Sequence, residues 1–181
     1  MLLDICEEAE ENGHKVIVFS FYKMVLNKVY QHLEDKTFEP ITGDVSNKRR
    51  QEIIDEFTEA EAGGVLISQI EAGGVGLNIQ AANVVILCEP QWKPSTEEQA
   101  ISRAYRMGQS RNVFVYRLLT EDSIDMSMME LLDEKSQLFN LYARDSEVAD
   151  IAQDRREVSE SSLQQQALEL EKKRLAEKQG V

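Results

Sequence analysis

The chain has 181 residues, slightly more than one domain of average size, which is about 150 residues. Hydrophobic residues make up 42% and charged residues 29%, so the composition excludes collagen-like, disulfide-rich and wholly disordered chains. The 20 basic and 33 acidic residues give a formal net charge of -13, which argues against a protein that coats nucleic acid through its overall charge. A local basic groove is compatible with this balance, because individual side chains and amides make phosphate contacts.

The two cysteines, Cys6 and Cys88, stand far apart and outside any CxxC pattern. Together with the two histidines they lack the spacing of a zinc site, so we expect reduced, partly buried thiols and no metal site. The N-terminus turns acidic at once, unlike a signal peptide, and no apolar stretch is long enough to span a bilayer. These features predict a cytoplasmic protein without a membrane partner.

Segments of strand-like and helical periodicity alternate along the chain. Short apolar runs predict five strands, over residues 15–20, 38–41, 65–68, 84–88 and 113–119. Five helices are predicted around them: an acidic one closed by Asn12-Gly13, one over residues 22–33, one capped by Ser46 and broken at Gly63-Gly64, one from a capping box at Ser95–Glu98 to about Met107, and one over residues 123–142. This alternation indicates βαβ units, and therefore an α/β fold with a mostly parallel sheet covered by helices on both faces.

The composition changes at about residue 145, where strand signals end and Glu, Gln, Lys and Ala dominate. This change predicts an exposed helical extension that braces the domain or leads to a further segment. We therefore expect two parts, an α/β lobe over residues 1–144 and a charged helical extension over residues 145–181.

Loops that follow strands are the first candidates for a site, because ligands of open α/β sheets bind at the carboxyl ends of the strands. Gly73, Gly74 and Gly76 come shortly after the strand over residues 65–68, and glycines let backbone amides approach a phosphate closely. A plain glycine-rich turn explains this pattern at least as well, since it matches neither a P-loop nor a dinucleotide-binding motif.

A second candidate lies on the helix predicted to start at Ser95. Arg103 and Arg106 are three residues apart and Gln99 is four residues before Arg103, so the three side chains share one helix face. Two permanently charged, forked guanidinium groups suit a polyphosphate. The alternative is a solvated charged face, which is the commoner explanation for an arbitrary pair of arginines. Trp92, which lies between two prolines, is by default a packing wedge.

Three runs resemble helicase motifs V, Va and VI in the form found in the Swi/Snf-like family of superfamily two: Ala72–Asn78, Val84–Trp92 and Gln99–Gln109. Two upstream segments agree with this order: Val16–Tyr22 resembles motif IV, and Thr42-Gly43-Asp44 with Arg50 and Phe57 is similar to the family's glycine–arginine–phenylalanine segment. The resemblance covers roughly Lys15 to Arg117. Its Arg-x-x-Arg-x-Gly-Gln ending is distinctive, because RNA helicases of the DEAD-box kind usually end this motif with Arg-x-Gly-Arg.

The resemblance implies the second, C-terminal RecA-like lobe of an ATP-dependent double-stranded-DNA translocase. In such proteins ATP lies between two lobes, and the first lobe brings the phosphate loop, its lysine and the acids that handle Mg2+ and water. Matched by motif, Arg103 and Arg106 are the candidate arginine fingers and Gln99 positions them. The nucleotide-sensing motif, which also touches the DNA backbone, contributes the candidate ATP-binding residues Gly74, Gly76 and Asn78.

The same resemblance implies a set of DNA contacts: Ser20, Phe21, Arg50, Gly73, Trp92 and Lys93. The basic run Lys48-Arg49-Arg50 is equally well explained as an exposed turn, and Arg50 as a structural residue. Gln69 and Glu71 depart from the family pattern, which often has Thr and a basic residue there. Glu71 would repel a phosphate that it faced.

The chain lacks a Walker A motif, and its acidic pairs Asp55-Glu56 and Asp133-Glu134 lie in helical segments as expected of surface carboxylates. We therefore expect no ATP hydrolysis by this chain alone, with ATP and Mg2+ held mainly by the missing first lobe. The expected partners are double-stranded DNA, that N-terminal lobe and a DNA-bound target protein, at the nucleoid or other DNA in the cytoplasm. The alternatives are a non-catalytic RecA-like scaffold module and an RNA helicase lobe, which the Gly-Gln ending and the Trp92 loop disfavour.

Overall fold

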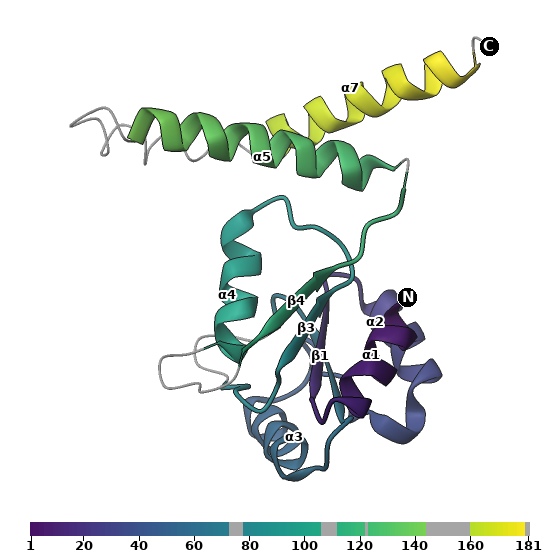
Figure 1. Ribbon diagram of the computed structural model, residues 1–181, viewed down its shortest axis with the longest axis vertical. Helices are drawn as coiled ribbons and strands as arrows, with labels where there is room; N and C mark the ends of the chain where they lie inside the picture. The colour runs from purple at the N-terminus through teal and green to yellow at the C-terminus, as the bar shows by residue number, and fades with distance from the viewer. Residues whose placement is uncertain (73–77, 106–111, 122, 144–159, 180–181) are drawn as a thin grey trace. The chain divides into compact units, whose positions relative to one another are not determined.

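The computed structural model describes residues 1–72, 78–105, 112–121, 123–143 and 160–179 (Figure 1). The chain divides into two compact units. The first comprises Met1–Glu89 and Ser95–Leu118, and the second comprises Pro90–Pro94 and Leu119–Val181. Within the described ranges, none of the helices has the length and apolar character needed to cross a membrane.

Four parallel strands form the sheet of the first unit, in the order β2-β1-β3-β4. They are β1 (Val16–Ser20), β2 (Val65–Gln69), β3 (Val84–Leu87) and β4 (Phe114–Arg117). In the inner strand β1, Val18 pairs with Ile67 of β2 on one side and with Ile86 of β3 on the other. Because helices cover both faces, β1 and β3 are buried throughout, and their sequences are apolar runs without alternation. The predicted α/β fold is confirmed.

Helices pack on both faces of this sheet (Figure 1). They are α1 (Leu2–Glu11), α2 (Lys23–His32), α3 (Asn47–Glu59) and α4 (Pro94–Ala104), with a short 3-10 turn, η1, at Glu34–Lys36. Val16 and Val18 face α1 and α2 in one core cluster, whereas Ile17 and Phe19 face α3 and α4 in the other. Successive residues of a strand point to opposite faces, which divides the core in this way.

Local chemistry explains where these helices begin and end. Gly13 follows α1 with φ +71°, a left-handed conformation that glycine adopts without strain. The Ser46 hydroxyl accepts a hydrogen bond from the Arg49 amide at 3.3 Å, so the predicted cap of α3 is confirmed. α4 begins at Pro94, one residue before the predicted capping box, and proline suits the first helical position because it lacks an amide hydrogen.

The predicted strand over residues 38–41 is wrong. Within it, only Ile41 forms an isolated bridge to β2, with Ser68, while Thr37 just before it bridges to Val65. Pro40 interrupts the run, and a proline has no amide hydrogen to donate to a ladder. The segment therefore follows the outer edge of β2 without becoming a strand.

Among the described residues of the second unit are two helices, α5 (Ile124–Ala143) and α7 (Glu160–Gln179), which pack against each other. α5 agrees with the helix predicted over residues 123–142, and α7 lies within the predicted helical extension. The proposed boundary between residues 144 and 145 falls outside the described residues and stays a prediction.

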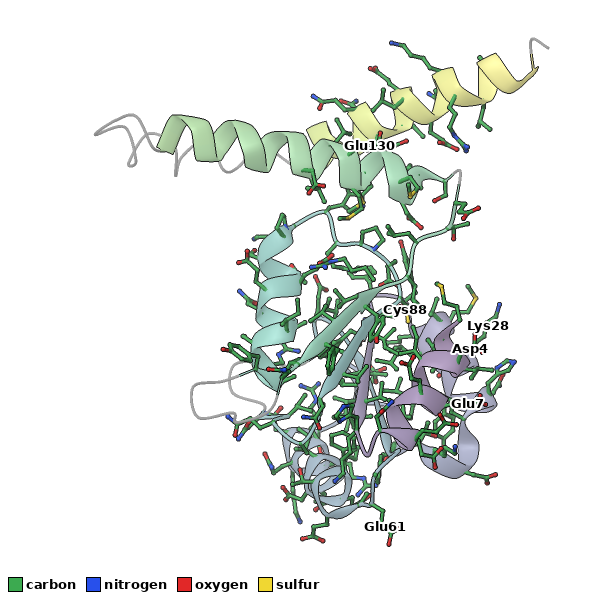
Figure 2. The ribbon with its side chains drawn as sticks, in the orientation of Figure 1. Asp4, Glu7, Lys28, Glu61, Cys88 and Glu130 are labelled. Carbon is green, nitrogen blue, oxygen red and sulfur yellow. The ribbon has the colours of Figure 1, made fainter. Side chains whose placement is uncertain are left out.

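Both cysteine thiols are free, and both contribute to the core that α1 and α2 cover; Figure 2 labels Cys88. Burial raises the pKa of the Cys6 thiol to about 11. Burial also raises the pKa of Cys88 to about 12, with a smaller effect in the same direction from the Glu89 carboxylate. At neutral pH both groups are therefore neutral thiols, as expected of reduced core cysteines.

These pKa values predict a loss of stability in alkaline solution. Since both are raised above the ordinary value of 9.0, the unfolded chain releases these protons first. The contribution of the two protonated thiols to the free energy of unfolding is complete below pH 9.0 and is lost as the pH rises toward 11 and 12. We expect urea unfolding to show a steeper fall in stability above pH 9.0 for the native sequence than for a variant with Cys6→Ala and Cys88→Ala. Equal slopes for the two proteins would contradict the prediction.

Candidate functional site

The loops at the carboxyl ends of β1, β2 and β3 form the candidate site. After β1 the chain continues into α2 on one face of the sheet, and after β3 it continues into α4 on the other face. Neighbouring strands whose connections leave on opposite faces mark the switch point at which α/β sheets bind ligands. Here this point lies between Ser20 at the end of β1 and Glu89 shortly after β3.

The Glu89 carboxylate joins these two loops. It accepts a hydrogen bond from the Ser20 hydroxyl at 2.9 Å and another from the Phe21 amide at 2.5 Å. The Tyr22 amide in turn donates to the Ser20 hydroxyl oxygen at 3.0 Å. Ser20 is fully buried, whereas the rings of Phe21 and Tyr22 are exposed and lie edge to face at 5.4 Å between centroids.

Gln69, at the end of β2, connects the loop after β1 with the loop that contains Gly43. Its side-chain amide nitrogen donates to the Phe21 carbonyl at 3.2 Å, and its oxygen accepts from the Gly43 amide at 3.2 Å. A threonine, common at this place in the family pattern, has too short a side chain to bridge the two loops in this way. The departure at Gln69 thus has a structural role.

Arg50 joins the same loop to the start of the glycine-rich segment. It is only 9% exposed, and its guanidinium donates to the carbonyls of Thr42 at 2.9 Å, Gly43 at 3.1 Å and Ala72. These bonds use both terminal nitrogens for internal carbonyls. The structure therefore places Arg50, predicted as a DNA contact or a structural residue, in a structural position.

The two basic neighbours of Arg50 have different surroundings. The Arg49 guanidinium forms ion pairs with Glu39 at 2.8 Å, Glu56 at 2.9 Å and Glu52 at 3.4 Å, which raise its pKa. The Lys48 side chain is 89% exposed and lies 3.8 Å from Glu52. The basic run thus contains one exposed cation, one cation paired with acids and one buried cation.

Arg103 lies on α4 beside the loop that follows β2. Its guanidinium donates to the Ile70 carbonyl at 3.3 Å and lies 6.0 Å from the centroid of the Phe19 ring. Partial burial lowers the pKa of the Arg103 guanidinium below its ordinary value, although the group stays charged at neutral pH. The Arg103 carbonyl accepts from the Ile79 amide at 2.9 Å, so α4 also holds the chain just after the glycine-rich segment.

Of the other predicted nucleotide-binding residues, the structure describes Gln99 and Asn78. Gln99 is exposed on α4, and Asn78 is exposed with its amide 3.3 Å from the Gln80 side-chain oxygen. Gly73, Gly74, Gly76 and Arg106 lie outside the described residues.

The predicted DNA contacts Trp92 and Lys93 lie in Pro90–Pro94, which belongs to the second unit, and the Lys93 side chain is exposed.

In the first unit, Glu97 in the first turn of α4 accepts a hydrogen bond from Arg117 at the end of β4, at 2.6 Å. The Glu97 side chain is only 9% exposed, so this ion pair attaches α4 firmly to the sheet.

Two hollows lie at the opposite, amino edge of the sheet. They are lined by residues such as Asn12, His14 and Phe114, and none of the predicted site residues contributes to them. Within the described part of the chain, no group of three His, Cys, Asp or Glu side chains is placed to hold a metal ion. In its described residues, the candidate site is therefore a set of loops linked by hydrogen bonds.

A parallel sheet between two helical layers, with linked loops at its carboxyl edge, defines a RecA-like α/β lobe. Comparison with known proteins supports this description of the lobe. The crystal structure of the C-terminal part of the Fun30 ATPase domain is similar with a TM-score of 0.68 and 32% identity, over 72% of this chain and 43% of that one. The model of the helicase conserved C-terminal domain matches residues 1–108. The chain belongs to this helicase C-terminal domain family, in its Swi/Snf-like branch.

Curated relatives include proteins from plants and from humans. DNA repair protein RAD5B of Arabidopsis thaliana is 37% identical over 139 residues, which are 76% of this chain and 11% of that protein. SNF2 domain-containing protein ENL1 of Oryza sativa subsp. japonica is 33% identical over 76% of this chain and 14% of its own length. Lymphoid-specific helicase of Homo sapiens is 33% identical over 78% of this chain and 17% of its own length. The chain thus spans a small fraction of these relatives.

Sequence reasoning missed two residues that hold the site together, Glu89 and Glu97. A signal for Glu89 was present, because it is a carboxylate that follows a fully buried strand almost directly, at the switch point of the sheet. For Glu97 the capping box drew attention to the helix start, whereas its side chain bonds to Arg117 on β4.

Proposed function

We propose that this chain is the C-terminal lobe of an ATP-dependent double-stranded-DNA translocase and supplies one half of a shared ATP site. The observation that carries the proposal is the position of Arg103. Its guanidinium is half-buried at the carboxyl edge of a RecA-like sheet, beside the chain that enters the glycine-rich segment. A fixed cation at such an edge can stabilise the charge that develops on a phosphoryl group during transfer.

In this proposal Arg103 and Arg106 act as arginine fingers, and Gln99, Gly74, Gly76 and Asn78 complete this lobe's side of the ATP site. An N-terminal lobe of the parent protein would hold ATP and Mg2+ and provide the residues that activate water. Since no Walker A motif occurs in the chain, we expect no hydrolysis by this lobe alone.

Contacts with double-stranded DNA are proposed for the loops at the carboxyl edge of the sheet and, separately, for the segment 90–94 of the second unit. The proposed contacts are Ser20, Phe21, Gly73, Trp92 and Lys93. For Arg50 we favour a positioning role, because its terminal nitrogens already donate to carbonyls within the lobe. The net charge of -13 requires that any attraction to DNA be local.

The proposal is tested by mixing this chain with the N-terminal lobe of its parent and measuring phosphate release from ATP. We expect hydrolysis only when both lobes and duplex DNA are present, with each lobe alone as the control. If the two lobes bind each other but the mixture stays inactive, the scaffold alternative is supported. Stimulation by RNA but not by duplex DNA would instead support an RNA helicase lobe.

A further inference from the structure

The loop after β1 carries two donors suited to an anion, and an internal carboxylate already occupies both. These donors are the Ser20 hydroxyl and the Phe21 amide, at 2.9 Å and 2.5 Å from the two oxygens of Glu89. Hydrogen bonds from a hydroxyl or an amide to a carboxylate are charge-assisted and stronger than neutral ones. A DNA phosphate would have to displace Glu89 in order to use either donor.

The backbone fixes Glu89 in this place. The pairing of β3 with β1 ends at Leu87 and Phe19, and the next amide, that of Cys88, still donates to the Phe19 carbonyl at 2.9 Å. The following residue is Glu89, so its carboxylate reaches the end of β1 from a rigid neighbouring strand. Ser20 is fully buried, whereas the Phe21 and Tyr22 side chains are 43% and 56% exposed.

We propose that Glu89 is a positioning residue for DNA binding, which holds the loop after β1 so that Phe21 and Tyr22 are presented to the duplex. This view revises the proposed DNA contact at Ser20, which is fully buried: Ser20 acts through Glu89 and does not itself touch a phosphate. The inference rests on the proposed function, because it assigns to the loop after β1 a place in the DNA interface. It also makes a counterintuitive prediction, namely that removing a negative charge weakens binding to a polyanion.

The anchor, meaning the hydrogen bonds from Ser20 and Phe21 to Glu89, is tested first. The measurement is the nuclear magnetic resonance signal of the Phe21 amide in the 181-residue chain. A short hydrogen bond to a carboxylate moves an amide proton far downfield and slows its exchange with water. We expect both effects to disappear in Glu89→Ala and to weaken in the nearly isosteric Glu89→Gln. The control is Glu71→Gln, which removes an exposed carboxylate from the loop after β2 and should leave the Phe21 signal unchanged.

The role in binding is tested by fluorescence anisotropy of a labelled mixed-sequence duplex, titrated with the same chain at low ionic strength. We expect Glu89→Ala to bind about fivefold more weakly, because the loop after β1 loses both hydrogen bonds to Glu89 and must then be ordered on binding. Glu71→Gln should bind equally or more tightly, because it loses only a charge that repels phosphate. Circular dichroism melting of each variant checks that it is folded at the temperature of the titration.

A double-mutant cycle separates the two possible roles of Ser20. If Ser20 acts through Glu89, adding Ser20→Ala to Glu89→Ala causes no further loss of affinity. A further loss of about fivefold would show that Ser20 contributes independently of Glu89 and would overturn that part of the proposal.

The outcomes for the two proposals are distinguishable. If the native chain binds the duplex and Glu89→Ala binds as tightly as Glu71→Gln, the positioning role is overturned while the proposed function stands. If the native chain binds no duplex at all, the proposed DNA interface fails and the positioning role fails with it. An unperturbed Phe21 amide in Glu89→Ala would overturn the anchor itself, whatever the affinity.

Discussion

DNA-stimulated ATP hydrolysis by the combined lobes is expected to fall by about three orders of magnitude when Arg103 is replaced by alanine. The guanidinium is held in place by the Ile70 carbonyl at 3.3 Å and by the Phe19 ring, so it needs little reordering to meet a phosphoryl group. Partial burial also strengthens its field, because less water screens the charge. Arg103→Lys should recover only a small part of the rate, since lysine keeps the charge and loses the planar fork.

The measurement is phosphate release by the two-lobe mixture with saturating duplex DNA. Ser102→Ala is the matched control, because Ser102 is exposed on the same helix and its hydroxyl donates only within α4, to the Gln99 carbonyl at 2.8 Å. Arg106→Ala, tested in parallel, should give a loss of similar size if both arginines act as fingers. A rate for Arg103→Ala within about twofold of the control would exclude an arginine-finger role for Arg103.

The second large effect concerns stability. We expect Arg50→Ala to lower the free energy of unfolding by about 3 kcal/mol, because the change removes a buried cation and three hydrogen bonds to carbonyls. The carbonyls of Thr42, Gly43 and Ala72 would lose their charged donor, and the loops that carry them would no longer be joined. Urea unfolding followed by circular dichroism measures the difference.

The neighbouring Arg49 provides the control for Arg50. Arg49 forms ion pairs with three carboxylates, but these groups are solvent-exposed and water screens their attraction. Arg49→Ala should therefore destabilise the lobe much less than Arg50→Ala. If the two variants unfold at the same urea concentration, Arg50 does not have the structural role that its contacts indicate.

Much of the fold follows from local patterns. The runs at Val16–Ser20 and Val84–Leu87 predict their strands correctly, because a strand buried on both faces must be apolar throughout. The cap at Ser46 and the turn at Gly13 are likewise local in origin. The incorrect strand over residues 38–41 shows the limit of this reasoning, since four residues containing Pro40 cannot sustain a ladder.

The candidate site depends on contacts between distant parts of the sequence. Ser20 and Glu89 are 69 positions apart, and Arg50 and Ala72 are 22 positions apart. Periodicity does not encode such pairs, because they arise only when parallel strands bring their carboxyl ends together. Motif resemblance singled out candidate loops, but only the folded structure shows which side chains, such as Arg50 and Glu89, hydrogen-bond within them.

Pro40 has a consequence for the behaviour of the lobe in solution. A long, regular strand at the edge of a sheet offers a continuous row of amide donors and carbonyl acceptors to the edges of other molecules, and so promotes aggregation. Here the segment with bridges at Thr37 and Ile41 covers the outer edge of β2, and Pro40 removes one donor between them. This irregular cover protects β2 from pairing with a second molecule, at the edge of the sheet where a full strand would have extended the template.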